Sequence, residues 1–134
     1  MRKTTVLGAL AGIFLGTAVP LLAHHAFSAE FDQSKPLKVS GEISKVEWVN
    51  PHAWIFIDAK DADGKVTPWR FEMGAPNALL RAGWSKSDIK VGTAVTISGF
   101  QARSGGPVGN AFQVRLPDGR DLFAASSLKD AGAK

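Results

Sequence analysis

Five segments with strand-like patterns, interrupted by one short helical segment, constrain the fold of this chain most strongly. The strand-like segments cover residues 37–50, 52–60, 66–72, 94–102 and 110–116, and a further short strand is expected over 121–124. Between the third and fourth, residues 76–82 are expected to form a short helix that ends at Gly83, because glycine favours a helix C-terminus. The pattern predicts a mainly β domain with one helix in its middle.

The first strand-like segment is expected to bend. Alternate residues of a strand face the same side, and Val39 and Ile43 fall on one alternating set whereas Val46 and Trp48 fall on the other. This change predicts a bulge or a sharp bend near residues 41–45. The second segment, residues 52–60, is apolar on both alternating sets, which is typical of a strand covered on both faces.

Three strands, a helix and two more strands is the order of an OB-fold, a small Greek-key barrel in which a long first strand serves both halves. We therefore predict a five- to six-stranded OB-like barrel with one short helix between strands three and four. An open β-sandwich of about six strands is the alternative. The predicted core consists of Val39, Ile43, Val46, Ile55, Ile57, Phe71, Leu79, Val95, Ile97 and Val114.

The first 23 residues have the layout of a secretory signal peptide. Arg2 and Lys3 form a short cationic start, residues 6–22 carry no charge, and the small residue Ala23 ends the segment. A membrane anchor is the alternative, but the apolar run is at the lower limit for crossing a bilayer and contains Pro20. We predict cleavage after Ala23, with a cut after Ala18 as its main rival, and hence an exported bacterial protein that is periplasmic or secreted.

The predicted mature chain suits one small domain. Removing 23 of the 134 residues leaves 111, which carry all 12 acidic residues and 14 of the 16 Lys and Arg, so the mature net charge is near +2. No dense basic run is present, and we predict no nucleic-acid partner and no membrane association after cleavage. Cysteine is absent, which excludes disulfides and a thiol nucleophile.

The expected organisation has four parts. A signal peptide covers residues 1–23, a lead-in segment 24–36, a single β domain 37–125 and a flexible tail 126–134.

The three histidines are the candidate metal ligands. Cleavage after Ala23 would leave His24 with both a free α-amine and an imidazole, which can chelate one ion. His25 or His52 could complete a nitrogen-rich site of the kind that suits Cu(II) or Zn(II). Alternatively, the His24–His25 pair is simply solvated and His52 is a hydrogen-bonded turn residue beside Trp48 or Trp54.

A second candidate site is a ligand or partner surface formed by Trp48, Asn50, Trp54 and Arg103. The two tryptophans flank an Asn50-Pro51-His52 turn, and Arg103 precedes a glycine-rich loop over residues 104–110. OB-folds often bind ligands at these two loops. The alternative is that the tryptophans only pack the barrel and its hairpins.

The sequence offers no catalytic constellation. It lacks a Gly-x-Ser-x-Gly motif and a phosphate-binding glycine loop, and its spacing shows no carboxylate pair for acid–base chemistry. Glu47 or Glu72 could orient a ligating histidine, although both also fit solvated charges on a strand face.

Four strings of the sequence stand out: His24-His25-Ala26-Phe27 with Glu30-Phe31-Asp32, the central Trp48-Val49-Asn50-Pro51-His52, the run from Pro76 to Trp84, and Leu116 to Arg120. Together they resemble a family of small exported bacterial proteins of unknown function. Ala26 departs from the pattern, which more often has Ser there. The resemblance implies an exported single domain, directs attention to the three histidines and supplies no reaction.

Taken together, these features predict a non-enzymatic periplasmic binding domain, monomeric, with copper or zinc as the one cofactor that its residues suggest. A peptide- or protein-interaction module of the cell envelope, without a metal, is the alternative. A copper-dependent oxidase or oxygenase acting through the His24 terminus is a third hypothesis.

Overall fold

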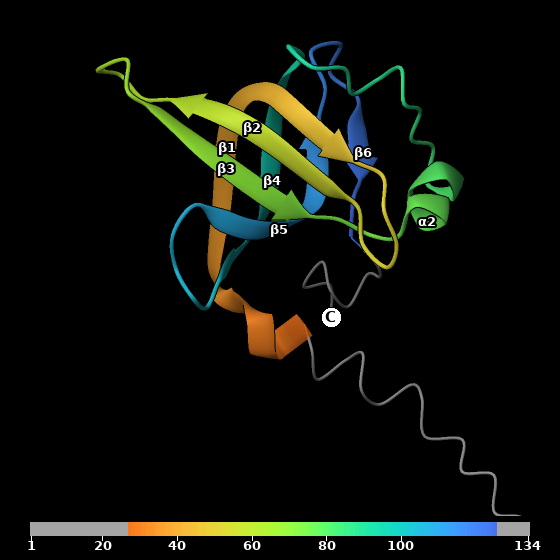
Figure 1. Cartoon of the computed structure of the whole chain (residues 1–134), viewed down its shortest axis with the longest axis horizontal. Helices are drawn as coiled ribbons and strands as arrows, with labels where there is room; N and C mark the ends of the chain where they lie inside the picture. The colour runs from red at the N-terminus through yellow and green to blue at the C-terminus, as the bar shows by residue number, and fades with distance from the viewer. Residues whose placement is uncertain (1–26, 126–134) are drawn as a thin grey trace, which may run out of the picture.

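The computed structural model describes residues 27–125. Its strands are β1 (Phe31–Glu47), β2 (Trp54–Lys60), β3 (Val66–Glu72), β4 (Ala94–Ala102), β5 (Val108–Arg115) and β6 (Asp121–Phe123), and its helix is α2 (Pro76–Arg81) (Figure 1). Residues 27–30 form one helical turn before β1. The predicted signal peptide, His24, His25 and the predicted tail from residue 126 lie outside the described residues.

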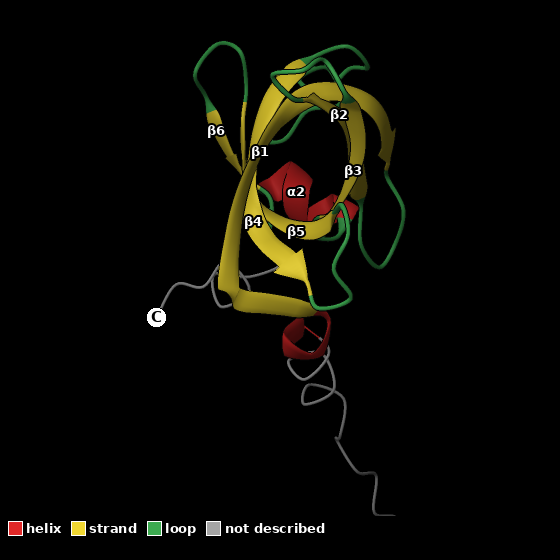
Figure 2. Ribbon diagram, turned by 90° about the vertical axis from the view of Figure 1, so that its left-hand side faces the viewer, coloured by secondary structure: helices red, strands yellow, loops and turns green. Residues whose placement is uncertain are grey.

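The strands form one sheet that closes on itself. Neighbours follow the order β3-β2-β1-β4-β5-β6, and a parallel pairing between β3 and β5 joins β1, β2, β3, β5 and β4 into a ring (Figure 2). All other pairings are antiparallel. This arrangement confirms the predicted mainly β, OB-like barrel with its helix between the third and fourth strands.

β1 is long and bent because it belongs to both halves of the ring. Its earlier part pairs with β4, and its later part pairs with β2 from Glu42 onward. The register shifts between Ile43 and Lys45, where the sequence predicted the bend. At Gly41 a side chain would not fit, since a Cβ there would lie 2.5 Å from the Asp58 carbonyl oxygen.

The start of β1 differs from the prediction, which began the strand at residue 37. Phe31 and Asp32 already pair with Ala102 and Gln101 of β4. The register then shifts before Pro36, a tolerated place for a residue that lacks an N–H donor. The sequence did not predict this part of the strand, because its residues are mostly polar, do not alternate with apolar residues and include a proline.

The core fills the ring and the space under α2. Eight of the predicted core residues are buried: Ile43, Ile55, Ile57, Phe71, Leu79, Val95, Ile97 and Val114. Val39 and Val46 are partly buried and pack against this core at its margin.

α2 lies against one end of the barrel (Figures 1 and 2). Pro76 suits the first helical turn, Leu79 is buried in the core, and Gly83 follows with φ +94°, as expected for a glycine after a helix. Trp84 is 3% exposed, and its indole Nε1 donates to the Phe123 carbonyl oxygen at 2.7 Å, which fixes the short strand β6. Within residues 27–125, no helix is long and apolar enough to span a bilayer.

β4 and β5 approach most closely at a bulge beside Gly99. The register shifts between Ser98 and Gly99, and the buried Asn110 side chain accepts the Phe100 N–H through Oδ1 at 3.1 Å. A Cβ on Gly99 would lie 1.7 Å from the Asn110 carbonyl oxygen. Only glycine therefore fits this position.

We predict that Gly99→Ala destabilises the fold by about 2 kcal/mol or more, because overpacking against backbone forces a strand to move. Urea unfolding followed by tryptophan fluorescence measures the loss. Ser98→Ala, on the neighbouring residue, is the control and should cost less than about 1 kcal/mol. Equal stability of Gly99→Ala and the wild type would show that the strands are not packed this closely.

Candidate functional site

A cleft lies between the N-terminal segment and the barrel wall, and we call it the N-terminal cleft. Its volume is about 470 Å³, within the range of small-molecule sites. One wall comes from residues 29–31, a second from β2 and β3, and a third from the end of β4 with the residues that follow. The lining residues are Ala29, Glu30, Phe31, Trp54, Arg70, Glu72, Ala102, Arg103, Ser104 and Val108.

A small second core anchors the N-terminal wall. Phe31 is 3% exposed and packs with Phe100 and Ala102 of β4. Phe27 lies 5.3 Å from Phe31 between ring centroids, and Phe112 of β5 lies 5.7 Å from Phe100. These aromatic contacts hold residues 27–31 on the barrel independently of the main core.

Arg103 holds the same segment through polar contacts. Its backbone N–H donates to the Glu30 carbonyl oxygen at 2.8 Å, and its Nε donates to the Ser28 carbonyl oxygen at 2.7 Å. Its Nη1 lies 3.9 Å from Asp32 Oδ2. Hydrogen bonds from Ser34 lower the pKa of Asp32, with a smaller contribution from Arg103, so Asp32 is an anion at neutral pH. We call this set of contacts the Arg103 clasp.

His52 reaches the N-terminal cleft through Glu72. Its Nδ1 contacts Glu72 Oε1. The two residues meet because Trp54 pairs with Glu72 across β2 and β3, and His52 precedes this pair by two residues. The His52 side chain is 41% exposed and that of Glu72 is 14% exposed, so the carboxylate lies deeper than the imidazole. The contact leaves Nε2 as the ring nitrogen that can bind a ligand.

Trp54 and Arg70 form the adjoining part of the wall. The Arg70 guanidinium carbon lies 5.6 Å from the centre of the Trp54 ring, a cation–π arrangement. Glu47, the other carboxylate considered as a partner for a histidine, instead pairs with Lys45. The structure therefore brings Glu72, rather than Glu47, to His52.

The predicted surface residues separate into two groups. Trp54 and Arg103 line the N-terminal cleft, although they are far apart in sequence. Trp48 instead packs against Trp84 with ring centroids 6.4 Å apart, and Lys86 lies over its ring. Asn50 is exposed and precedes Pro51 through a cis peptide bond.

No group of three or more metal-ligating side chains (His, Cys, Asp or Glu) is found within residues 27–125. His52 and Glu72 are a pair, and His24 and His25 lie outside this part of the chain. A complete metal site that uses His52 would therefore need a contribution from outside the described range.

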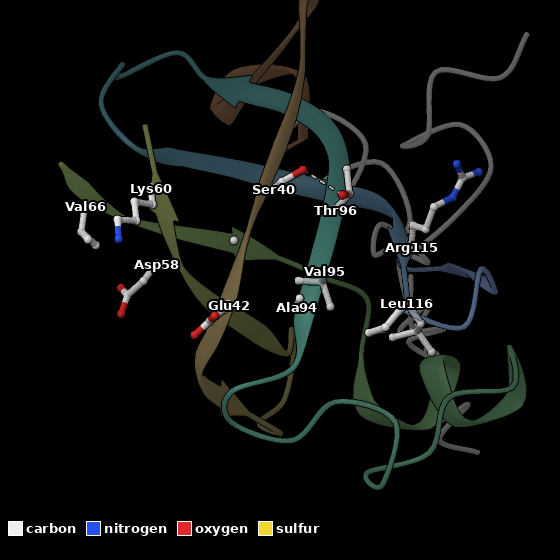
Figure 3. Close-up of a pocket in the computed structure, with 12 residues that line it drawn as sticks. Ser40, Glu42, Asp58, Lys60, Val66, Ala94, Val95, Thr96, Arg115 and Leu116 are labelled. Atoms are coloured by element: carbon white, nitrogen blue, oxygen red, sulfur yellow. Dashed lines mark hydrogen bonds between the residues drawn. The ribbon is translucent and has the colours of Figure 1, made fainter. Parts of the chain in front are cut away.

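A second cleft, of about 730 Å³, opens across β1, β2, β4 and the end of β5 (Figure 3). Ser40 Oγ and Thr96 Oγ1 are hydrogen-bonded at 2.8 Å beside it. Glu42 and Asp58 are direct neighbours across β1 and β2 on its rim. None of the residues proposed from sequence as site residues lines this cleft.

Comparison with protein families adds one match: the model of a family of unknown function, DUF6152, covers residues 13–111. The chain belongs to this family. The resemblance to an uncharacterised family is thereby confirmed, and the match spans the three histidines, Glu72, Arg103 and, of the second-core phenylalanines, Phe27, Phe31 and Phe100. No curated protein and no solved structure matches the chain.

Sequence reasoning missed the aromatic anchor, and it left open whether Glu47 or Glu72 would meet a histidine. Phe27 and Phe31 were noted only as parts of a family-like string, although two aromatic residues four apart are a usual signal of side chains on one face of a helical turn.

We predict that Phe31→Ala releases the N-terminal wall while the barrel stays folded, because it removes the centre of the second core. Endoproteinase Glu-C, which cuts after glutamate, should then cleave after Glu30 at least about tenfold faster. Val66→Ala, an exposed position on the β2–β3 hairpin, is the control. Unchanged cleavage at Glu30 would show that these phenylalanines do not hold the segment.

Proposed function

We propose that this chain is an exported, non-enzymatic binding domain that holds a copper or zinc ion between its N-terminal histidines and His52. In this proposal, the segment before His24 is a signal peptide removed after Ala23, and the mature protein functions in the periplasm or outside the cell. The ion would lie at the edge of the N-terminal cleft.

The contact between His52 and Glu72 is the observation that carries the proposal. Histidines that bind metals usually place their second ring nitrogen against a carboxylate or a carbonyl group, which fixes the ring and the tautomer. His52 has this arrangement, with Nδ1 on Glu72 and Nε2 left to bind an ion. The acidic partner is the less exposed of the two, as an orienting group should be.

The anchored N-terminal segment is the second support. Ala29 lines the cleft that Glu72 also lines, and His25 precedes Ala29 by four residues. Four residues of extended chain span at most about 14 Å. A histidine at position 24 or 25 is therefore within reach of this cleft by chain length.

The donor types agree with the proposed metals. An α-amine and two or three imidazoles form a nitrogen-rich set, which favours Cu(II) and Zn(II) over Mg²⁺ or Ca²⁺. Glu72 would act as a positioning residue that orients His52. Since the sequence shows no nucleophile motif, we propose binding rather than catalysis.

The test is a Cu(II) titration of the protein purified from the periplasm. The mass of the purified protein, measured first, identifies its first residue. We expect a mass that begins at His24 and one tightly bound ion with a visible d–d band. His52→Ala should weaken binding at least about tenfold, and Glu72→Gln should weaken it about tenfold, because outer partners typically contribute 10- to 100-fold.

Two controls make the copper test specific. Glu47→Gln removes a carboxylate paired with Lys45 and should leave the affinity unchanged. Acetylation of the α-amine should abolish the d–d band seen with the free terminus. If His52→Ala and the acetylated protein both bind copper as the wild type does, the proposed site is wrong.

The alternative function is an interaction module of the cell envelope without a metal. The supporting observation is Val49, which is 48% exposed in the loop between Trp48 and Asn50. This alternative predicts partner binding that is indifferent to chelators and sensitive to Val49→Ser.

A further inference from the structure

A second groove lies beside the N-terminal cleft on the outer face of β2 and β3, and we call it the Arg70 groove. Its volume is about 410 Å³. Arg70 and Val108 line both hollows, so the two are neighbours that share these side chains. The lining residues of the Arg70 groove are Ser44, Phe56, Pro68, Trp69, Arg70, Pro107 and Val108.

The lining of the Arg70 groove is mainly apolar, and Lys45 Nζ lies 5.3 Å from the centre of its Phe56 ring. Aromatic and proline rings supply most of the lining, and Arg70 is its one ionisable lining residue. Trp69 is held in place by stacking on Phe71, with ring planes 13° apart and centroids 5.6 Å apart. The rings are therefore positioned by the barrel rather than left to move freely.

Arg70 has no carboxylate partner among residues 27–125. The other cations nearby do: Arg103 faces Asp32, and Lys45 pairs with Glu47. Glu72, on the same face of β3, contacts His52. Arg70 is held by the Trp54 ring, and its backbone N–H donates to the Pro107 carbonyl oxygen. Its guanidinium N–H groups thus remain available to a planar anion.

We propose that the Arg70 groove binds a small aromatic carboxylate, with its carboxylate on Arg70 and its ring between Phe56, Pro68 and Pro107. The positive charge of Arg70 favours an anionic ligand, since a guanidinium group can donate two parallel hydrogen bonds to a carboxylate. The apolar lining, which consists mostly of rings, favours a ligand with an aromatic ring, and a groove of this volume holds one small molecule. This site is independent of the metal proposed above.

The test uses 2-naphthoate as the probe and 2-naphthamide as its neutral match. In ¹H–¹⁵N spectra recorded with a chelator present, naphthoate should shift the indole N–H of Trp69 and bind with a dissociation constant on the order of 1 mM or tighter. The amide should bind at least about tenfold more weakly, and added salt should weaken only naphthoate.

Two variants isolate the charge and the rings. Arg70→Gln should weaken naphthoate at least about tenfold and bring it to the affinity of the amide. Phe56→Ala should weaken both probes. Arg115→Gln is the control, because Arg115 is an exposed arginine that pairs with Asp121 and does not line the groove.

Equal binding of acid and amide would overturn the proposal, as would unchanged naphthoate binding by Arg70→Gln. No shift at Trp69 at concentrations on the order of 10 mM would also overturn it. Because a chelator is present throughout, failure here is distinguishable from failure of the copper titration.

Discussion

The packing of Phe31 against β4, together with the Arg103 clasp, is the constraint on which the site depends. The barrel itself would close without residues 27–30, since its ring is formed by β1 to β5. The N-terminal cleft would not exist, because residues 29–31 are one of its walls. The aromatic contacts supply apolar burial, and Arg103 donates hydrogen bonds to the carbonyl groups of Ser28 and Glu30.

The barrel then places two chemically different hollows side by side. The N-terminal cleft carries carboxylates, arginines and the pair of His52 with Glu72 at its edge, whereas the Arg70 groove is apolar with one cation. Arg70 separates them while its guanidinium is held over Trp54. In the two proposals, one side of this small domain supplies a nitrogen ligand for a metal and the other supplies an anion contact.

Most of the fold followed from the sequence because its signals are local. The turn over residues 61–64 is one example: Asp61 Oδ1 accepts the N–H groups of Asp63 and Lys65, and Gly64 has φ +84°. The bend in β1 was predicted because the apolar residues move from one alternating set of positions to the other, and it appears as the register shift after Ile43. The first residues of β1 could not be predicted, because Phe31 is buried in a second core that the alternation of apolar and polar residues does not indicate.

The site was less predictable because it depends on register between distant segments. The approach of Glu72 to His52 requires the pairing of Trp54 with Glu72, and Arg103 meets Ser28 across 75 residues of sequence. Residue type alone identified His52, Trp54 and Arg103 as candidates, but it also included Trp48, which packs against Trp84. Whether a tryptophan faces a cleft or a neighbouring ring depends on tertiary packing, which the local sequence pattern does not predict.

Hydrogen exchange of the Arg103 backbone N–H tests the central claim most directly, because this group donates to the Glu30 carbonyl oxygen and to no strand partner. If the N-terminal segment is held on the barrel, this amide should exchange at least about 100-fold more slowly than an unstructured one. Exchange close to the unstructured rate, with the Ile55 amide in the barrel core still protected, would contradict the account.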